Sequence, residues 1–238
     1  MDNPTYVMLT RQSGLMREMQ MLAHNIANIS TTGFRREGVV FSEYVHSLGR
    51  DEASLSMALG NTRHTWQTQG AMNQTNAPFD LAIEGEGFFL LETANGLRLT
   101  RAGSFTPNAA SELVNMDGHR VLDAGGGPIF VPPDAHSVGI ARDGSISADG
   151  QPLGQVGLVR PAEPVSMRRE AGTLFTFEGD LEPVEQGQVL QGFVEDSNVD
   201  ALSEMARMIA VQRAYEAGQS LLEREDERIR NVIQTLGR

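Results

Sequence analysis

The feature that most constrains how this chain can fold is an apolar seven-residue repeat at each of its ends. Near the amino terminus the repeat consists of Met8, Leu15, Leu22 and Ile29, with Met19 and Ile26 between them. Near the carboxyl terminus it consists of Ala201, Met208, Tyr215, Leu222, Ile229 and Leu236, with Met205 and Ile233 between them. Such spacing places an apolar stripe along one face of an α-helix. Helices of this kind are marginally stable alone in water, so we expect them to pair with each other, with copies of the chain, or with both.

Local signals mark the ends of these two helices. The residues 28–33 combine Asn, Ser, Thr and Gly, which end helices by adopting left-handed backbone or by bonding to backbone groups, so the first helix should stop there. The segment 196–198, Asp-Ser-Asn, is the predicted N-cap of the second helix. The second stripe is interrupted by polar Gln212, Gln219 and Asp226, which we expect to contact neighbouring chains or water.

The interior of the chain has a different pattern. From residue 77 to residue 194, short apolar or alternating runs are broken every eight to twelve residues by Gly, Pro, Asn or Asp, which predicts an antiparallel β domain. The range 34–76 is polar and weakly periodic, and we expect an extended connector. The predicted fold class is therefore α+β, with paired terminal helices in 1–33 and 197–238 around a β-rich domain in 77–196.

Composition excludes several classes of function. The 238 residues carry a formal net charge of −12, and the longest basic runs are the pairs Arg35–Arg36 and Arg168–Arg169, so a nucleic-acid partner is not expected. The chain has no cysteine, which rules out disulfides and thiolate chemistry. We expect no membrane span, since no run of about 18 apolar residues occurs, and no cleaved secretory signal, since the amino terminus lacks an apolar core.

No motif predicts a catalytic, cofactor-binding or metal site. The segment 84–89, EGEGFF, has two of the three glycines of a dinucleotide fingerprint and predicts a turn. The segment 143–150 lacks the ligand pattern of a calcium loop and predicts two Asp-Gly turns that frame a short strand. The five histidines lack metal-ligand spacing, and Asp180 with Glu182 is expected to be a pair of solvated charges.

Several segments together resemble a known family, the flagellar rod and hook proteins. The run from Asn25 to Arg36, NIANISTTGFRR, is similar to the family's amino-terminal signature. DLAIEGEGFF at 80–89 and TRAGSF at 100–105 resemble its central segment. QGFVEDSNV at 191–199 and MIAVQRAYE at 208–216 resemble its carboxyl-terminal helix. The motif residues are Asn25, Asn28, Gly33, Phe34, Gln212, Arg213 and Tyr215. The opening residues 1–3 with Tyr6 and Gln12, and the short length, resemble the proximal-rod members. His24, Asn108 and Ser111 depart from the common pattern.

The resemblance implies a structural, non-enzymatic subunit of the bacterial flagellar basal body. In such proteins the terminal helices form an inner domain that lines the export channel, and the β domain faces outward. The implied partners are other rod proteins, copies of the chain and, at the rod base, the membrane-embedded ring and export gate. The implied location is the periplasmic rod, reached by type III export without a cleaved signal. The predicted assembly seam consists of Met8, Leu15, Met19, Leu22, Ile26, Ile29, Met208, Tyr215, Leu222, Ile229, Ile233 and Leu236.

Three alternatives remain open from the sequence. One is a distal-rod or hook-type axial subunit. Another is a periplasmic β-domain enzyme that acts on the cell wall, although no pair of acid and base residues stands out for it. The third is a binding module whose helical ends mediate oligomerisation.

Overall fold

The computed structural model describes residues 3–46, 55–184 and 187–236. The chain divides into two compact units. The helical unit consists of Met1–Ile29, Arg36–Trp66 and Val199–Arg238, and the β unit consists of Ser30–Arg35 and Gln67–Asn198. The two ends of the chain thus belong to one unit, and most of the interior belongs to the other. The predicted α+β class, with terminal helices in contact around an antiparallel β region, is confirmed.

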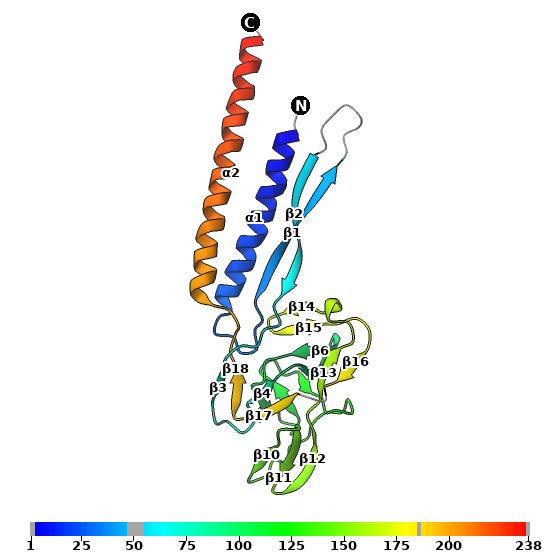
Figure 1. The fold of residues 1–238 in the computed structure, drawn as a ribbon. Helices are drawn as coiled ribbons and strands as arrows, with labels where there is room; N and C mark the ends of the chain where they lie inside the picture. The colour runs from blue at the N-terminus through cyan, green and yellow to red at the C-terminus, as the bar shows by residue number, and fades with distance from the viewer. Residues whose placement is uncertain (1–2, 47–54, 185–186, 237–238) are drawn as a thin grey trace. The chain divides into compact units, whose positions relative to one another are not determined.

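The helical unit contains two long helices and a hairpin. Helix α1 spans Asn3–Ala27 and helix α2 spans Ala201–Leu236. Strands β1 (Glu37–His46) and β2 (Leu55–Thr65) pair antiparallel. Figure 1 shows α1 between α2 and this hairpin, and α1 packs against both. Neither helix contains a described stretch that is apolar enough to cross a membrane.

The helix ends follow the local signals only in part. Helix α1 ends at Ala27, within one residue of the predicted stop, so Ile29 lies beyond it. The predicted N-cap of α2 at 196–198 is wrong. The capping residue is Asp200, whose carboxylate accepts hydrogen bonds from the Ser203 N–H at 3.0 Å and from the Ser203 hydroxyl. Asp200 directly precedes the first helical residue, which is the position from which a side chain reaches the third N–H of a helix.

The range 34–76, for which the sequence predicts an extended connector, contains β1, β2 and β3 (Met72–Gln74). The hairpin approaches α1 closely where glycine leaves room. A Cβ atom added at Gly14 of α1 would lie 2.6 Å from the Phe41 ring of β1. At the base of the hairpin the Trp66 ring covers Gly38.

The β unit is built from short antiparallel strands. Within the described residues, its largest sheet has nine strands, with β14-β15-β6-β5-β9-β8-β7 in spatial order and β13 and β16 attached through β5. The remaining strands form a three-stranded sheet, β10-β11-β12, and the pairs β17-β4 and β18-β3. The strand bounds are β4 Leu81–Glu84, β5 Phe88–Thr93, β6 Gly96–Thr100, β7 Phe105–Pro107, β8 Leu113–Asn115, β9 Arg120–Val121, β10 Val138–Ile140, β11 Ser145–Ala148, β12 Gln151–Gln155, β13 Leu158–Pro161, β14 Arg168–Ala171, β15 Leu174–Thr176, β16 Leu181–Pro183, β17 Gln188–Gln191 and β18 Phe193–Glu195.

Strand β5 lies at the centre of the core. Its residues alternate between two hydrophobic clusters, with Phe89 and Leu91 in one and Phe88 and Leu90 in the other. Because successive side chains of a strand point to opposite faces, both faces of β5 are buried, which explains its uninterrupted apolar run. The preceding segment 84–87 turns between β4 and β5 with Gly85 and Gly87 at positive φ. Strand β11 lies between two Asp-Gly turns, as predicted.

Candidate functional site

The contact between the two terminal helices is the first candidate site, and its apolar part is small. Leu15, Leu22 and Val211 are buried, and they are flanked by partly buried Met19, Met208, Ala214 and Tyr215. Five of these seven residues belong to the predicted assembly seam. Val211 and Ala214 lie outside the heptad positions and were not predicted, because a straight helix drifts relative to a strict seven-residue repeat.

Polar contacts fix the register of α1 against α2. Glu18 is largely buried, accepts a hydrogen bond from Arg207 Nε at 2.7 Å, and forms an ion pair with Arg207 Nη2 at 2.6 Å. Gln12 donates from Nε2 to the Tyr215 carbonyl at 2.9 Å and packs on Gly218, where a Cβ atom would overlap the Gln12 amide. A glycine in a helix interior costs about 1 kcal/mol relative to alanine. Here that cost permits the close approach of the Gln12 side chain.

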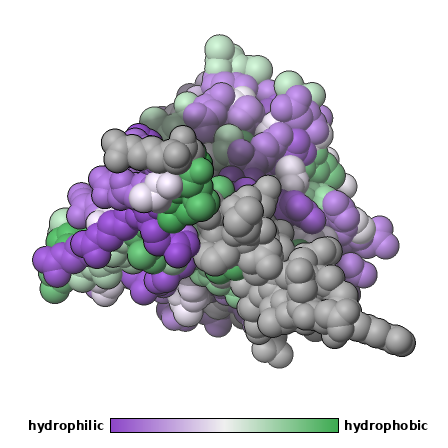
Figure 2. Space-filling model, turned by 90° about the horizontal axis from the view of Figure 1, so that it is seen from above, coloured by the Kyte–Doolittle hydropathy of each residue, from purple (hydrophilic) through white to green (hydrophobic). Residues whose placement is uncertain are grey.

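The rest of the predicted seam is not buried in this chain. Met8, Ile26, Ile29 and Leu222 are partly exposed. Ile229, Ile233 and Leu236 are 41%, 64% and 82% exposed. The seam as an assembly surface therefore stays a prediction, with one part inside the helix pair and another open to contact. Figure 2 shows hydrophobic residues among predominantly hydrophilic ones on the face that it draws.

The family-motif residue Asn25 ties three segments of the helical unit together. It is fully buried near the end of α1. Its amide donates to the Glu37 carbonyl of β1 at 2.7 Å and to the Glu204 carboxylate of α2 at 2.9 Å, and its oxygen accepts the Glu37 N–H at 3.0 Å. Each polar atom of the side chain is thus used. Asn28, the second motif residue, donates to the His24 carbonyl at 2.8 Å and so satisfies an exposed end of the helix.

Glu204 has a second partner in the same cluster. Arg36 donates from Nε to the buried Glu204 carboxylate and stacks its guanidinium 4.3 Å from the centre of the Trp66 ring. This role of Glu204 was not predicted, since an acidic residue in the first turn of a helix is usually solvated and its position alone does not show that it is buried.

In the β unit, Gly33 and Phe34 hold the motif segment against its neighbours. Gly33 has a φ of +69°, and a Cβ atom there would overlap the backbone of Arg101 and Ala102. Its N–H donates to the Glu195 carbonyl at 2.6 Å. Phe34 is fully buried, with the Arg169 guanidinium 4.3 Å from its ring centre. Arg169 also donates to the Arg35 carbonyl at 2.5 Å.

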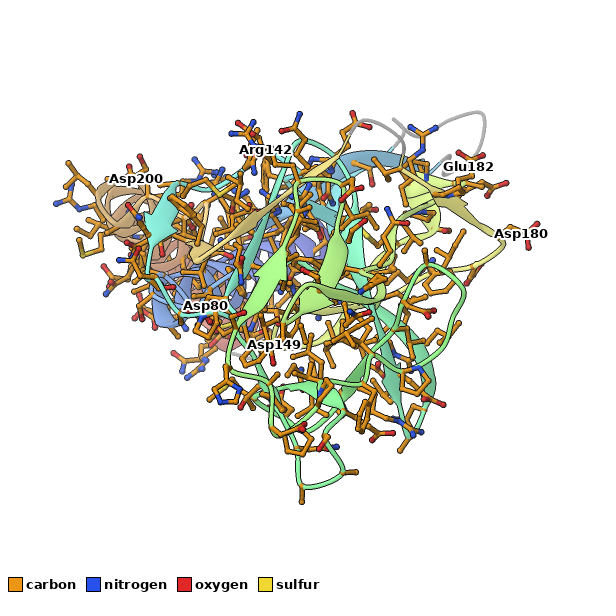
Figure 3. All side chains as sticks on the ribbon, turned by 90° about the horizontal axis from the view of Figure 1, so that it is seen from below. Asp80, Arg142, Asp149, Asp180, Glu182 and Asp200 are labelled. Atoms are coloured by element: carbon orange, nitrogen blue, oxygen red, sulfur yellow. The ribbon has the colours of Figure 1, made fainter. Side chains whose placement is uncertain are left out.

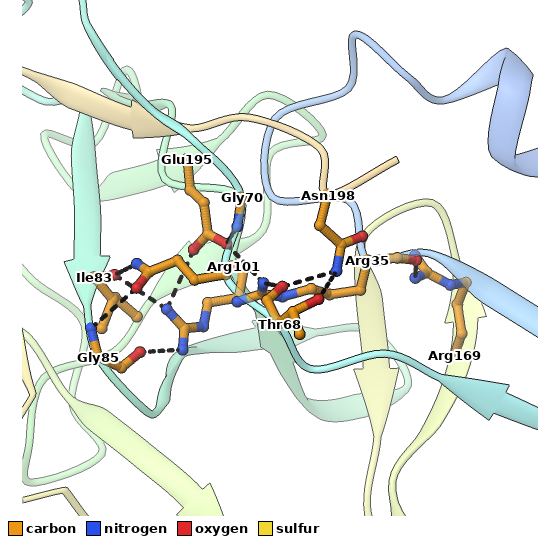
Figure 4. Close-up of polar contacts among 10 residues, drawn as sticks. Arg35, Thr68, Gly70, Ile83, Gly85, Arg101, Arg169, Glu195 and Asn198 are labelled. Carbon is orange, nitrogen blue, oxygen red and sulfur yellow. Dashed lines mark hydrogen bonds and ion pairs between the residues drawn. The ribbon is translucent and has the colours of Figure 1, made fainter. Parts of the chain in front are cut away.

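A buried ionic triad lies beside this segment (Figure 4). Glu195 pairs with Arg35 at 2.9 Å through one carboxylate oxygen and with Arg101 at 3.2 Å through the other. The Gly70 N–H also donates to Glu195 at 2.9 Å. Arg101 donates further to the Ile83 and Gly85 carbonyls at 3.1 and 2.6 Å. All three charged side chains are at most 5% exposed.

The triad holds two cations against one anion. Loss of hydration on burial lowers the pKa of Arg101 to about 10, although the attraction of Glu195 opposes this shift. Burial likewise lowers the pKa of Arg35, again against the attraction of Glu195. Because Arg101 still titrates well above neutral pH, the triad depends on Glu195 for charge compensation. Glu195 and Arg101 were not predicted as structural centres, since they are 94 residues apart in the chain and no spacing rule joins them.

The remaining motif residues lie on the exposed side of α2. Gln212 and Arg213 are exposed, and Gln212 donates to Glu216 one turn later at 3.0 Å. Gln212 and Arg213 therefore have no part in the buried contacts described above. They stay candidates for contacts with other chains. Asn198, which precedes α2, donates instead to the Thr68 carbonyl at 2.8 Å within the β unit.

The described acidic residues that could serve as catalytic or metal-binding groups do not gather at one place in the β unit. Figure 3 shows Asp180 and Glu182 near each other at the periphery, away from Asp80 and Asp149. Asp180 and Glu182 are exposed, and Glu182 pairs with Arg160 at 3.0 Å. Among the described residues, no group of three His, Asp or Glu side chains is placed to hold a metal ion.

Comparison with known proteins agrees with this geometry. A family model described as the flagellar hook protein FlgE/F/G D1 domain matches residues 82–148, and one described as the flagellar basal body rod FlgEFG protein C-terminal matches residues 190–235.

Full-length relatives extend the match over the whole chain. The chain is 37% identical to the flagellar basal-body rod protein FlgF of Caulobacter vibrioides, over 100% of this chain and 99% of that one. It is 33% identical to FlgF of Rhizobium meliloti over the same shares of the two chains. It is 29% identical to the flagellar basal-body rod protein FlgG of Bacillus subtilis, over 96% of this chain and 97% of that one. With the motif residues in these positions and relatives matched over their full length, the chain belongs to the FlgE/F/G family of flagellar rod and hook proteins, which are structural rather than enzymatic.

Proposed function

We propose that this chain is a subunit of the proximal part of the flagellar rod. It polymerises there with related rod proteins and copies of itself into a helical tube that crosses the periplasm, transmits torque and surrounds the export channel. The ring and the export gate at the rod base are further partners. The FlgF relatives, which are the more similar of those described above, favour the proximal position over the distal one.

One observation carries this proposal. The terminal helices pack against each other through an apolar face of α2. On α2 this face extends beyond the contact with α1, so an apolar surface near the end of α2 remains exposed. A heterologous contact made by such a surface produces an open helical filament when the rotation between successive subunits does not close into a ring.

Torque transmission requires that load does not shear the elements apart. In the helical unit, the polar clamp of Glu18 with Arg207 resists sliding of the two helices along each other. The Asn25 cluster ties α1 and α2 to the start of the hairpin. These bonds are directional, whereas apolar contacts alone tolerate changes of register.

Deletion of the gene, followed by complementation, tests the proposal. The deletion strain should be non-motile, and complementation should restore swimming and place the chain in purified basal bodies, on the proximal rod by immunogold electron microscopy. Complementation with the surface variant Glu182→Gln provides the control and should restore swimming equally. A deletion strain that swims, or a chain absent from basal bodies, would refute the proposal. Labelling of the distal rod would move the subunit to that position.

A further inference from the structure

Helix α2 is longer than the helix it packs against. The contacts of Gln12 with Tyr215 and of Glu18 with Arg207 show that the two helices run antiparallel. At 1.5 Å per residue, Asn3 at the start of α1 lies level with about residue 225 of α2. Figure 1 shows α2 continuing past the start of α1. The last three turns of α2, about 16 Å, therefore have no partner helix in the described chain.

This overhang carries an exposed apolar surface, the carboxyl-end face, formed by Ile229, Val232, Ile233 and Leu236. Ile229 follows the buried Val211 by 18 residues, which is five full helical turns. The carboxyl-end face is thus a continuation of the face that packs against α1 lower on the same helix. Continuity with an existing helix contact indicates that another helix occupies it.

A second exposed apolar surface, the amino-end face, lies at the other end of α2 and consists of Leu202, Met205 and Ile209. Leu202 precedes Val211 by nine residues, or two and a half turns, so this face points away from α1. The exposed Ala206 and Ala210 lie beside it. Small residues next to an apolar ridge leave the hollows into which side chains of a facing helix fit.

The two faces have the same spacing. The amino-end face has apolar residues at i, i+3 and i+7 from Leu202, and the carboxyl-end face has them at i, i+3 and i+7 from Ile229. They also lie on opposite sides of the helix at opposite ends. The two faces of one α2 helix cannot contact each other, so neither buries the other within one chain. The carboxyl-end face of one chain can, however, contact the amino-end face of the next chain when both helices run in the same direction.

We propose that the carboxyl-end face of α2 docks on the amino-end face of the α2 helix of a neighbouring rod-family subunit, so that second helices overlap head to tail along the rod. This inference rests on the proposed function. Aligning Ile229 with Leu202 of the neighbour shifts successive helices by about 40 Å. The overlap is only about two turns long, so it holds only where further contacts between subunits add to it.

Photo-crosslinking in assembled rods tests the docking. A benzophenone amino acid replaces Ile233 in the full chain, the chain complements the deletion strain, and crosslinked peptides from purified basal bodies are identified by mass spectrometry. The expected peptide is 201–213 of α2, or the matching segment of another rod subunit in the region covered by the carboxyl-terminal family model. A probe at Met205, on the amino-end face, should conversely capture the last turns of the α2 helix of the neighbouring subunit. Leu236 provides another probe position on the carboxyl-end face.

The control probe replaces Asn231, which is exposed and lies on the opposite side of the helix from Ile229. It should lose the crosslink to 201–213. Capture of a β-unit peptide or a ring protein by the Ile233 probe, or equal capture by the control, would overturn the docking while leaving the rod assignment intact. If neither the chains with probes nor the unsubstituted chain enters basal bodies, that result would instead refute the proposed function.

Discussion

Gly33 and Phe34 suit their positions for opposite steric reasons. No side chain fits at Gly33, whereas the large side chain of Phe34 is fully buried. The positive φ of Gly33 and the backbone of Ala102 beside it leave room for hydrogen alone. The Phe34 ring, by contrast, fills a buried space under the Arg169 guanidinium. Both residues were singled out from the sequence. Their reasons for being there could be known only once the facing backbone was placed.

Substitution of Gly33 by alanine should destabilise the β unit by roughly 3 kcal/mol or more, because it adds a steric overlap to the cost of a left-handed backbone. Gly126→Ala is the matched control, since Gly126 has a φ of +83° with nothing within 4 Å of an added Cβ. It should cost only about 1 kcal/mol. Urea denaturation followed by circular dichroism measures both. Equal losses would show that crowding at Gly33 is unimportant.

Replacement of Glu195 by glutamine should destabilise the chain by about 3 kcal/mol, because Arg35 and Arg101 would remain buried without a counter-charge. The glutamine keeps a carbonyl oxygen for the Gly70 N–H, so the loss reports on charge. Glu182→Gln breaks an exposed pair with Arg160 and should change stability by less than about 1 kcal/mol. Denaturant midpoints at constant m-value give the comparison, and a stable Glu195→Gln chain would contradict the role of the triad.

At the scale of elements, the sequence predicted what depends on local period and missed what depends on remote partners. The seven-residue repeats locate both helices, and the apolar run of β5 marks a central strand. The hairpin of β1 and β2 was expected as a connector, since its polar residues obscure alternation and its pairing is only with itself. Partners such as Asn25 and Glu204 are separated by 179 residues, and no spacing rule joins them.

Leu22 and Ile229, two aliphatic residues of the predicted seam, should differ in how much their replacement by alanine destabilises the chain. Leu22→Ala removes buried side-chain volume between α1 and α2 and should cost about 2–3 kcal/mol of stability. Ile229→Ala lies on the exposed overhang and should leave the stability of the dilute chain within about 0.5 kcal/mol of the original while reducing incorporation into rods. Thermal unfolding and basal-body content are the two measurements. A destabilising Ile229→Ala would mean that the overhang is already covered within the monomer.

The start of α2 should be sensitive to acid. Hydrogen bonds from the Ser203 hydroxyl and N–H lower the pKa of Asp200 below its ordinary value. A carboxylate with a depressed folded-state pKa stabilises the fold above its unfolded pKa and loses that contribution as pH falls through the folded value. The cap should therefore persist at the pH where an unperturbed aspartate takes up a proton, and the first turn of α2 should lose it only as the pH falls further. Asp200→Asn keeps a capping oxygen without a titrating group, so amide exchange at Ser203 should become less dependent on pH in that variant. An unchanged pH profile would exclude Asp200 as the titrating group.

The whole molecule combines two units whose cores differ greatly in size. The β unit buries two hydrophobic clusters that meet at β5, together with the ionic triad. The helical unit buries Leu15, Leu22 and Val211, while most of α2 is exposed. Apolar burial is the main stabilising term in folding, so the subunit should have one robust part and one that gains much of its stability from neighbours. We therefore expect the helical unit to be stabilised mainly when neighbouring subunits are present.

Hydrogen exchange of the dilute full chain tests that division. Amides of β5, β6 and β15 should be the most protected, α1 and the paired part of α2 should exchange through a lower-energy opening, and residues 226–236 should exchange fastest, because isolated helical turns are marginal in water. In assembled rods the protection of 226–236 should rise most. The variant Leu22→Ala should speed exchange throughout the helix pair and leave the β unit unchanged, which separates the two units in one experiment. Uniformly slow exchange along both helices in the dilute chain would show that the helical unit is stable before assembly, and the dependence on neighbours would then be wrong.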